Sequence, residues 1–192
     1  RLIFMDPKGT IPRPVPPPKK AVFCLGSFDG VHIAHASLLR DGMKMAATLS
    51  GHGDRVLCGV FCFWRPSMDY IPAKDTLGGV PTHLTTLKEK LARMGEIGVD
   101  FVCLCDFSEI QSMNAAEFIR LLETRCGCIA TVCGYNFRFG AGAEGSAETL
   151  QAHFKDLSLV LPPFVLGDEV VCSSLIRQHL LNGNVETANL LL

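Results

Sequence analysis

A glycine-rich turn followed by two histidines is the part of this sequence best suited to chemistry. The turn reads Gly26-Ser27-Phe28-Asp29-Gly30, and its glycines permit close backbone approach and positive φ angles. It joins an apolar run to a helical pattern, so it exposes helix N-terminal amides that can bind an anion. His32 and His35 are three residues apart, on one face of the first helical turn. Two imidazoles there can donate hydrogen bonds to a phosphate chain without a full positive charge.

This turn does not match the two best-known phosphate-binding motifs. No Gly-Lys-Ser/Thr follows Gly30, as a Walker loop requires, and the glycine spacing does not fit the G-x-G-x-x-G dinucleotide fingerprint. The remaining histidines are interpreted as surface or core residues. They are His52, His83, His153 and His179.

The elements that position the turn follow from an alternation of apolar runs and helical patterns, which is typical of a parallel sheet with crossover helices. Strands are predicted at residues 21–25, 55–63, 100–105, 129–132 and 158–161. Helices are predicted at 32–50, 85–97, 115–125, 148–154, 174–181 and from 185 onward. Together they predict an α/β fold with a Rossmann-like, doubly wound, mainly parallel five-stranded sheet. Such sheets bind ligands beyond the carboxyl ends of their strands.

The first 20 residues differ from the rest of the chain. Five prolines between Pro12 and Pro18 remove amide donors and favour extended, polyproline-like backbone. We expect residues 1–20 to form an arm outside the core and residues 21–192 to form one domain. The arm lacks the apolar segment of a secretory signal, so no export is expected.

Composition excludes several classes of protein. The 192 residues include 18 basic and 19 acidic side chains, for a net charge of −1, which disfavours nucleic acid as a partner. No run of about 18 apolar residues is present, so we expect no membrane insertion. A hydrophobic fraction of 48% is that of a globular domain and not of a disordered chain.

The nine cysteines are interpreted as packing residues rather than metal ligands. Most lie in the apolar runs, where cysteine behaves as a small hydrophobic residue. The pairs Cys103/Cys105 and Cys126/Cys128 are spaced CxC rather than CxxC, so no metal site is predicted. Reduced thiols suggest a cytoplasmic protein.

Four segments give the sequence a resemblance to a known family. They are FDGVHIAH (28–35), LTTLKEKLARMGEIGVDFVCLCDFSEI (84–110), CGYNFRFG (133–140) and VCSSLIRQHLLNGNVETANLLL (171–192). In order and spacing they resemble the FAD synthetases, the adenylyltransferase module of the bacterial bifunctional riboflavin kinase/FAD synthetases. The resemblance covers about residues 21–192 and implies the nucleotidyltransferase fold. Since the chain stops where the kinase barrel would begin, we expect no riboflavin kinase domain in it.

The resemblance implies a reaction in which the FMN phosphate attacks the α-phosphorus of Mg²⁺-bound ATP, giving FAD and pyrophosphate. It implies that the loop amides from Gly26 to Gly30 bind the ATP phosphates together with His32 and His35. His32, His35 and Arg177 are the catalytic residues it implies, acting on charge at the phosphate oxygens. No enzyme nucleophile is required, and Mg²⁺ is expected to be held by substrate phosphates and water.

Further site residues are implied on both sides of the reacting phosphates. Ser173 and Ser174 would contact the nucleotide from the start of a second helix, although Ser173 could also be a simple helix cap. Asn136 and Arg138 would face FMN. Trp64 and Arg65 are also assigned to the FMN side, and Trp64 would either stack on the flavin ring or fill an apolar gap.

Several positions depart from the family pattern and keep other functions open. Ala34 replaces the glycine of the family's HxGH motif, and the segment from Cys172 to Leu175 replaces its SSTR motif. Val170 stands where a basic residue often precedes that second motif. The segment Trp64-Arg65-Pro66 replaces a Pro-His-Pro loop. One alternative is a related adenylyltransferase with another phosphorylated acceptor. The other is a module that binds nucleotide or flavin without turnover. No oligomeric state is predicted.

Overall fold

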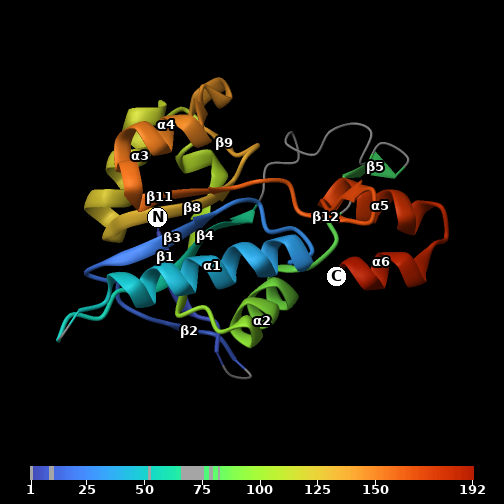
Figure 1. The fold of residues 1–192 in the computed structure, drawn as a ribbon, viewed down its shortest axis with the longest axis horizontal. Coiled ribbons are helices and arrows are strands. Elements are labelled where there is room, and N and C mark those ends of the chain that lie inside the picture. Colours follow the sequence, from blue (N-terminus) through green and yellow to red (C-terminus); the bar gives the residue numbers. More distant parts are fainter. Residues whose placement is uncertain (1, 9–10, 52, 66–75, 78–79, 82) are drawn as a thin grey trace.

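The computed structural model describes residues 2–8, 11–51, 53–65, 76–77, 80–81 and 83–192 (Figure 1). His52 and Pro66 lie outside these residues, and of Arg65 only the backbone is described.

The centre of the fold is a seven-stranded sheet in the order β11-β8-β3-β4-β7-β1-β2. Its five parallel strands are β3 (Ala21–Leu25), β4 (Leu57–Arg65), β7 (Phe101–Asp106), β8 (Cys128–Gly134) and β11 (Ser158–Leu161). These are the five predicted strands, so the mainly parallel α/β sheet is confirmed. The chain order reverses between β3 and β8, and the loops after these two strands open at the same edge.

The N-terminal segment belongs to the sheet, which corrects the expectation of an arm outside the core and raises the strand number from five to seven. Strand β1 (Ile3–Asp6) pairs antiparallel with β7, and β2 (Arg13–Pro14) pairs antiparallel with β1. Phe4 is buried, with its ring centroid 6.0 Å from that of Phe101. The proline-rich composition predicted an arm, but the apolar residues before these prolines complete the otherwise open edge of β7. Proline is tolerated in β2 because that strand is the sheet edge.

Helices cover both faces of the sheet (Figure 1). On one face lie α1 (Ile33–Leu49) and α2 (Leu87–Ile97), and on the other lie α3 (Ala115–Cys126) and α4 (Ala147–Phe154). The last two helices, α5 (Ser173–Leu181) and α6 (Val185–Leu191), form a hairpin beside the strand ends. All six predicted helices are confirmed to within two residues at each end. None of the helices in the described part of the chain combines the length and apolar character needed to span a membrane.

Short antiparallel pairs of strands lie in the loops around the sheet. They are β5 (Thr76–Leu77) with β6 (Val80–Pro81), β9 (Arg138–Phe139) with β10 (Gly145–Ser146), and β12 (Val165–Leu166) with β13 (Glu169–Val170). The last two pairs lie next to the segments that line the site described below.

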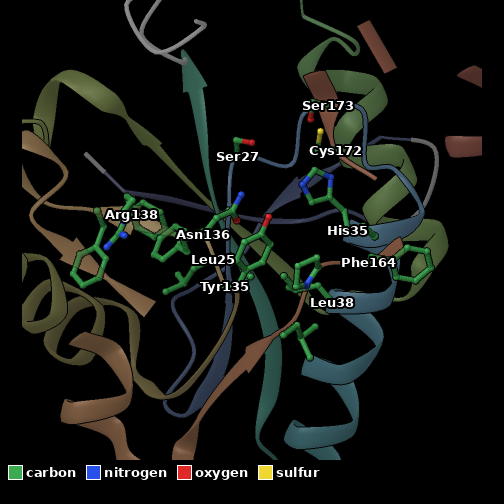
Figure 2. Close-up of a pocket in the computed structure, with 18 of the residues that line it drawn as sticks. Leu25, Ser27, His35, Leu38, Tyr135, Asn136, Arg138, Phe164, Cys172 and Ser173 are labelled. Atoms are coloured by element: carbon green, nitrogen blue, oxygen red, sulfur yellow. The ribbon is translucent and has the colours of Figure 1, made fainter. Parts of the chain in front are cut away.

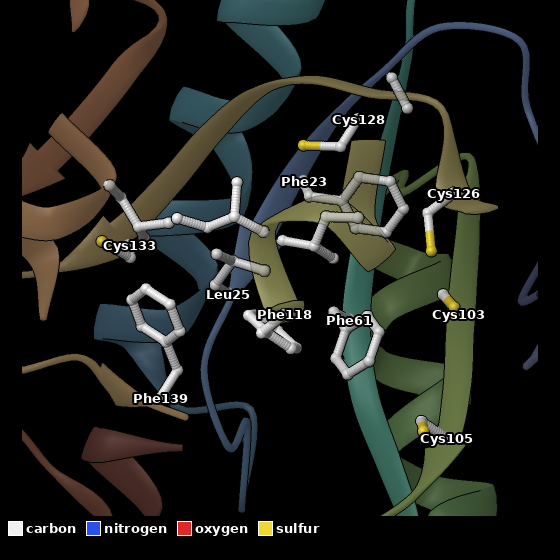
Figure 3. Close-up of a cluster of buried hydrophobic side chains, with 14 of the residues drawn as sticks. Phe23, Leu25, Phe61, Cys103, Cys105, Phe118, Cys126, Cys128, Cys133 and Phe139 are labelled. Atoms are coloured by element: carbon white, nitrogen blue, oxygen red, sulfur yellow. The ribbon is translucent and has the colours of Figure 1, made fainter. Parts of the chain in front are cut away.

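The cysteines pack as the sequence predicted. Eight of the nine are buried and all are free thiols. Figure 3 shows Cys103, Cys105, Cys126, Cys128 and Cys133 around the phenylalanines of the core under α3 and α4. Burial raises the pKa of the Cys133 thiol to about 12 and that of Cys105 to about 11, which keeps both thiols protonated. They act as small apolar side chains.

Candidate nucleotide-binding site

A cavity of about 1020 Å³ opens beyond the carboxyl ends of β3 and β8, where the strand order reverses (Figure 2). It is lined by the β3–α1 loop, the first half of α1, the loop after β8, and the segment that leads from β11 to α5. Seven of the predicted site residues line it: Gly26, Ser27, His32, His35, Asn136, Arg138 and Ser173. In Figure 2, His35 lies near Cys172 and Ser173, while Arg138 lies at the far end, beyond Tyr135 and Asn136.

The two histidines form a stacked pair at the start of α1. His32 is the N-cap residue, not the first residue of the helix, and its Nδ1 accepts a hydrogen bond from the His35 amide at 3.3 Å. The ring centroids are 3.6 Å apart and the planes differ by 16°. Since Nδ1 of His32 is an acceptor, the proton of its neutral ring resides on Nε2, which makes this atom a donor.

Burial keeps both imidazoles uncharged at neutral pH. Desolvation lowers the pKa of His32 to about 4, although the carboxylate of Asp29 opposes this shift. The pKa of His35 also lies well below its ordinary value, mainly because of burial and further because of the nearby charges of His32 and Lys90. Neutral donors are what the sequence predicted for this pair.

These lowered pKa values predict that acid destabilises the fold. Between pH 6.5 and about 4, the unfolded chain protonates His32 and the folded chain does not, so the stabilisation present above pH 6.5 is lost as the pH falls toward 4. His32 should contribute about 3 kcal/mol to that loss. Urea unfolding across this range measures it. The control is His32→Asn, which keeps a capping acceptor but does not titrate, and its curve should fall less steeply. Parallel curves would contradict the lowered pKa.

Asp29 joins the loop to two other parts of the chain. Its carboxylate accepts a hydrogen bond from the Leu84 amide at 3.0 Å and pairs with the guanidinium of Arg177. Its carbonyl accepts a hydrogen bond from the Ser173 hydroxyl at 2.9 Å. Both side chains of the Asp29–Arg177 pair are 9% exposed. One residue therefore fixes the loop against the segment before α2 and against the start of α5.

This network changes the expected role of Arg177. The family resemblance implied direct contact with the nucleotide, but Arg177 is not among the described residues that line the cavity, and it supports the loop through its ion pair with Asp29. Ser174 likewise does not line the cavity, whereas Ser173 does. Helix spacing placed Arg177 one turn beyond the serines, but it could not show which way the side chain points.

The backbone of the glycine loop is strained, and contacts with the surrounding residues keep it in this conformation. Phe28 and Val31 have φ angles of +51° and +44°, which are rare for residues other than glycine and especially for a β-branched one. The Phe28 side chain is fully buried, and the Gly30 amide donates to the Thr85 hydroxyl at 3.1 Å. Gly30 has a φ of +82°, and a Cβ there would lie 2.9 Å from a methyl carbon of Leu84. Phe28, Asp29 and Gly30 thus shape the loop without lining the cavity.

The far end of the cavity is aromatic. Asn136 and Arg138, which the family resemblance assigns to FMN, line the cavity. Trp64, at the end of β4, is 42% exposed and is not among the described residues that line the cavity. The sequence had not singled out most of the aromatic lining residues, although strand alternation places Phe61 and Phe63 on one face of β4. The aromatic residues that line the whole cavity are Phe61, Phe63, Phe107, Phe118, Tyr135, Phe137, Phe139 and Phe164, and of these Phe164 lies near His35, away from Arg138 (Figure 2).

Comparison with known proteins identifies a family for the chain. A family model described as FAD synthetase matches residues 15–175. The chain belongs to the FAD synthetase family. The matched segment contains the glycine loop, both histidines and the loop after β8, and therefore most of the cavity wall.

Curated relatives of this member of the FAD synthetase family are named as bifunctional enzymes. The chain is 31% identical over 185 residues to the riboflavin kinase/FMN adenylyltransferase of Escherichia coli strain K12, covering 92% of the chain and 55% of that protein. The enzyme of the same name from Bacillus subtilis strain 168 is 26% identical over 177 residues, covering 90% and 53%. The chain therefore spans about half the length of these curated relatives. The putative bifunctional enzyme of this type from Geobacillus thermodenitrificans is 28% identical over 173 residues, covering 90% of the chain and 89% of that protein.

One solved structure confirms the fold. It is a macrolide-efflux protein from Streptococcus pneumoniae, with a TM-score of 0.76 and 28% sequence identity, covering 91% of this chain and 55% of the other. The likeness extends over nearly the whole sheet and its helices.

Proposed function

We propose that this chain transfers AMP from ATP to FMN, giving FAD and pyrophosphate. The observation that carries the proposal is a single cavity with two unlike ends. One end offers the backbone of Gly26 and Ser27, two neutral imidazoles and the Ser173 hydroxyl at a helix start, which suit a phosphate chain. The other end is walled by phenylalanines, which suit a planar aromatic ring. An adenylyl transfer to FMN needs both ends in one space.

In the proposed reaction, a phosphate oxygen of FMN attacks the α-phosphorus of ATP. The new P–O bond forms as the bond between the α-phosphorus and the oxygen bridging to the β-phosphate breaks, and pyrophosphate leaves with that electron pair. Positioning and charge stabilisation supply most of the acceleration in such transfers, so no covalent step on the protein is needed. The Nε2–H of His32 and the loop amides would stabilise charge that develops on the phosphate oxygens.

Magnesium is proposed to enter with ATP. Of the described residues that line the cavity, Asp41 alone carries a carboxylate, and it already receives a 2.9 Å hydrogen bond from Lys44. This donor set fits an ion held mainly by substrate phosphates and water, as is usual for Mg²⁺. When bound, the ion neutralises phosphate charge. The chain's own residues would hold the phosphates in line and exclude bulk water.

The contacts of FMN are proposed from the far end of the cavity. Asn136 and Arg138 are the polar residues placed to bind it, and the phenylalanine walls would hold the flavin ring. We assign no flavin contact to Trp64. The partners proposed are small molecules, and neither nucleic acid nor a membrane is proposed as one. The free thiols fit a reducing compartment, so the cytoplasm is the proposed location.

Incubation of the chain with ATP, Mg²⁺ and one acceptor at a time tests the function. Pyrophosphate release and the chromatographic identity of the dinucleotide product are measured. We expect FAD with FMN, and no product with phosphopantetheine or nicotinamide mononucleotide. A different dinucleotide would point to another acceptor. ATP binding without pyrophosphate release would indicate a binding module, and either result would overturn the proposal.

A further inference from the structure

A buried lysine lies behind the phosphate loop and has no role in the reaction as described so far. Lys90 of α2 is 7% exposed, and its Nζ donates a hydrogen bond to the carbonyl oxygen of Ser27 at 3.1 Å. Among the described residues, no carboxylate lies within ion-pair distance of it. Burial of an ammonium group without a carboxylate partner is costly, so a position of this kind calls for an explanation.

The location of the Lys90 charge beside the cavity provides an explanation for its burial. Ser27 and His35 both line the cavity, and the charge of Lys90 acts on the His35 ring and on the Cys62 thiol of β4. The ammonium group therefore sits one layer behind the cavity wall, at the end where the histidines lie. Another buried cation, Arg177, is already offset by Asp29. Lys90 is thus a buried positive charge that no protein carboxylate neutralises in the described part of the chain.

We propose that Lys90 is a positioning residue for the triphosphate, resting on the proposed function. It acts in two ways, through its hydrogen bond to Ser27 and through its charge. Its hydrogen bond turns the Ser27 carbonyl toward the protein interior, so that Gly26 and Ser27, the two loop residues that line the cavity, can present their amides to the phosphates. Its charge, shielded from water, attracts the phosphates with little screening by salt. A chain with a net charge of −1 can in this way bind a highly anionic ligand without a basic surface.

Calorimetry with ATP and with adenosine tests the proposal, since only ATP carries the phosphates. Lys90→Met keeps the length of the apolar stem and removes the charge, and Lys90→Gln keeps a donor for the Ser27 carbonyl. We expect both variants to bind ATP about tenfold more weakly, equivalent to about 1.4 kcal/mol, and to bind adenosine as the wild type does. Lys90→Arg, which keeps the charge, should recover most of the ATP affinity. The pKa of His35, measured by NMR, should rise in both uncharged variants.

Arg93→Met is the matched control. Arg93 also lies on α2, and its guanidinium donates to the Gly30 carbonyl at 3.1 Å and to Leu192, but the side chain is only half-buried. If either lysine variant loses affinity for ATP and for adenosine by the same factor, Lys90 only holds the loop in place and the proposal is wrong. It is also wrong if ATP affinity is unchanged. If Lys90→Met does not fold, Lys90→Gln decides between these results. Because binding is measured rather than turnover, a wild type that makes no FAD would overturn the proposed function and leave this inference standing.

Discussion

Replacing His35 with alanine is expected to lower kcat/KM for FAD formation by about 10²- to 10³-fold, the usual cost of losing one donor to developing charge. His35 lines the cavity, and its ring is held by stacking on His32 and by contact with Phe28, with centroids 3.6 Å and 5.0 Å apart. A side chain so constrained loses little entropy when it binds a phosphate oxygen. Steady-state FAD formation at varied ATP and FMN concentrations measures the effect.

The control for His35→Ala is His153→Ala. His153 lies on α4 and pairs with Glu123 at 2.9 Å on the surface, away from the cavity-lining segments. Its loss should leave kcat/KM within a factor of two of the wild type. A His35→Ala protein that folds normally and turns over at the wild-type rate would show that His35 is not a catalytic residue.

Replacing Arg177 with methionine is expected to lower the free energy of unfolding by about 3 to 5 kcal/mol, because it leaves the Asp29 carboxylate buried without its counter-ion. Each side chain of the pair is 9% exposed. Asp29 also accepts hydrogen bonds from the Leu84 amide and the Ser173 hydroxyl. Its loss should loosen the glycine loop as well as α5. Urea denaturation followed by circular dichroism measures the change.

Two further variants test the reason for that loss. Arg55→Met breaks an exposed pair with Asp100, in which the arginine side chain is 74% exposed, and should cost less than about 1 kcal/mol. The double variant Asp29→Asn with Arg177→Met removes both charges and should be more stable than Arg177→Met alone. If the single Arg177 variant is no less stable than Arg55→Met, then the buried pair does not carry the stability assigned to it.

The sequence predicted the five parallel strands and six helices because each has a strong local pattern. The strands are apolar runs covered on both faces, and α2 and α3 begin with complete capping boxes, at Thr86 with Glu89 and at Asn114 with Glu117. It did not predict β1, because the four residues Ile3–Asp6 form a short run directly before a proline-rich stretch, and that stretch favours extended chain outside a sheet.

The sequence predicted the parts of the candidate site that depend on backbone and motif, and it missed the parts that depend on the direction of side chains. The glycine loop and the histidine pair follow from short spacings. Arg177 was placed on the correct helix but faces Asp29 and not the cavity. The sequence did not single out Lys90, which is distinguished by its burial against the Ser27 carbonyl. The aromatic end was missed because its members come from several separate segments that only the fold brings together.

The proline-rich segment at the sheet edge also bears on the behaviour of the protein in concentrated solution. The outermost strand, β2, contains Pro14, and its neighbour Val15 already donates its amide to Phe4 at 2.9 Å. Pro12 and the run from Pro16 to Pro18 have no amide hydrogens to offer a strand from another molecule. An exposed sheet edge is a common starting point for aggregation, and here the chain closes that edge with residues that cannot extend it.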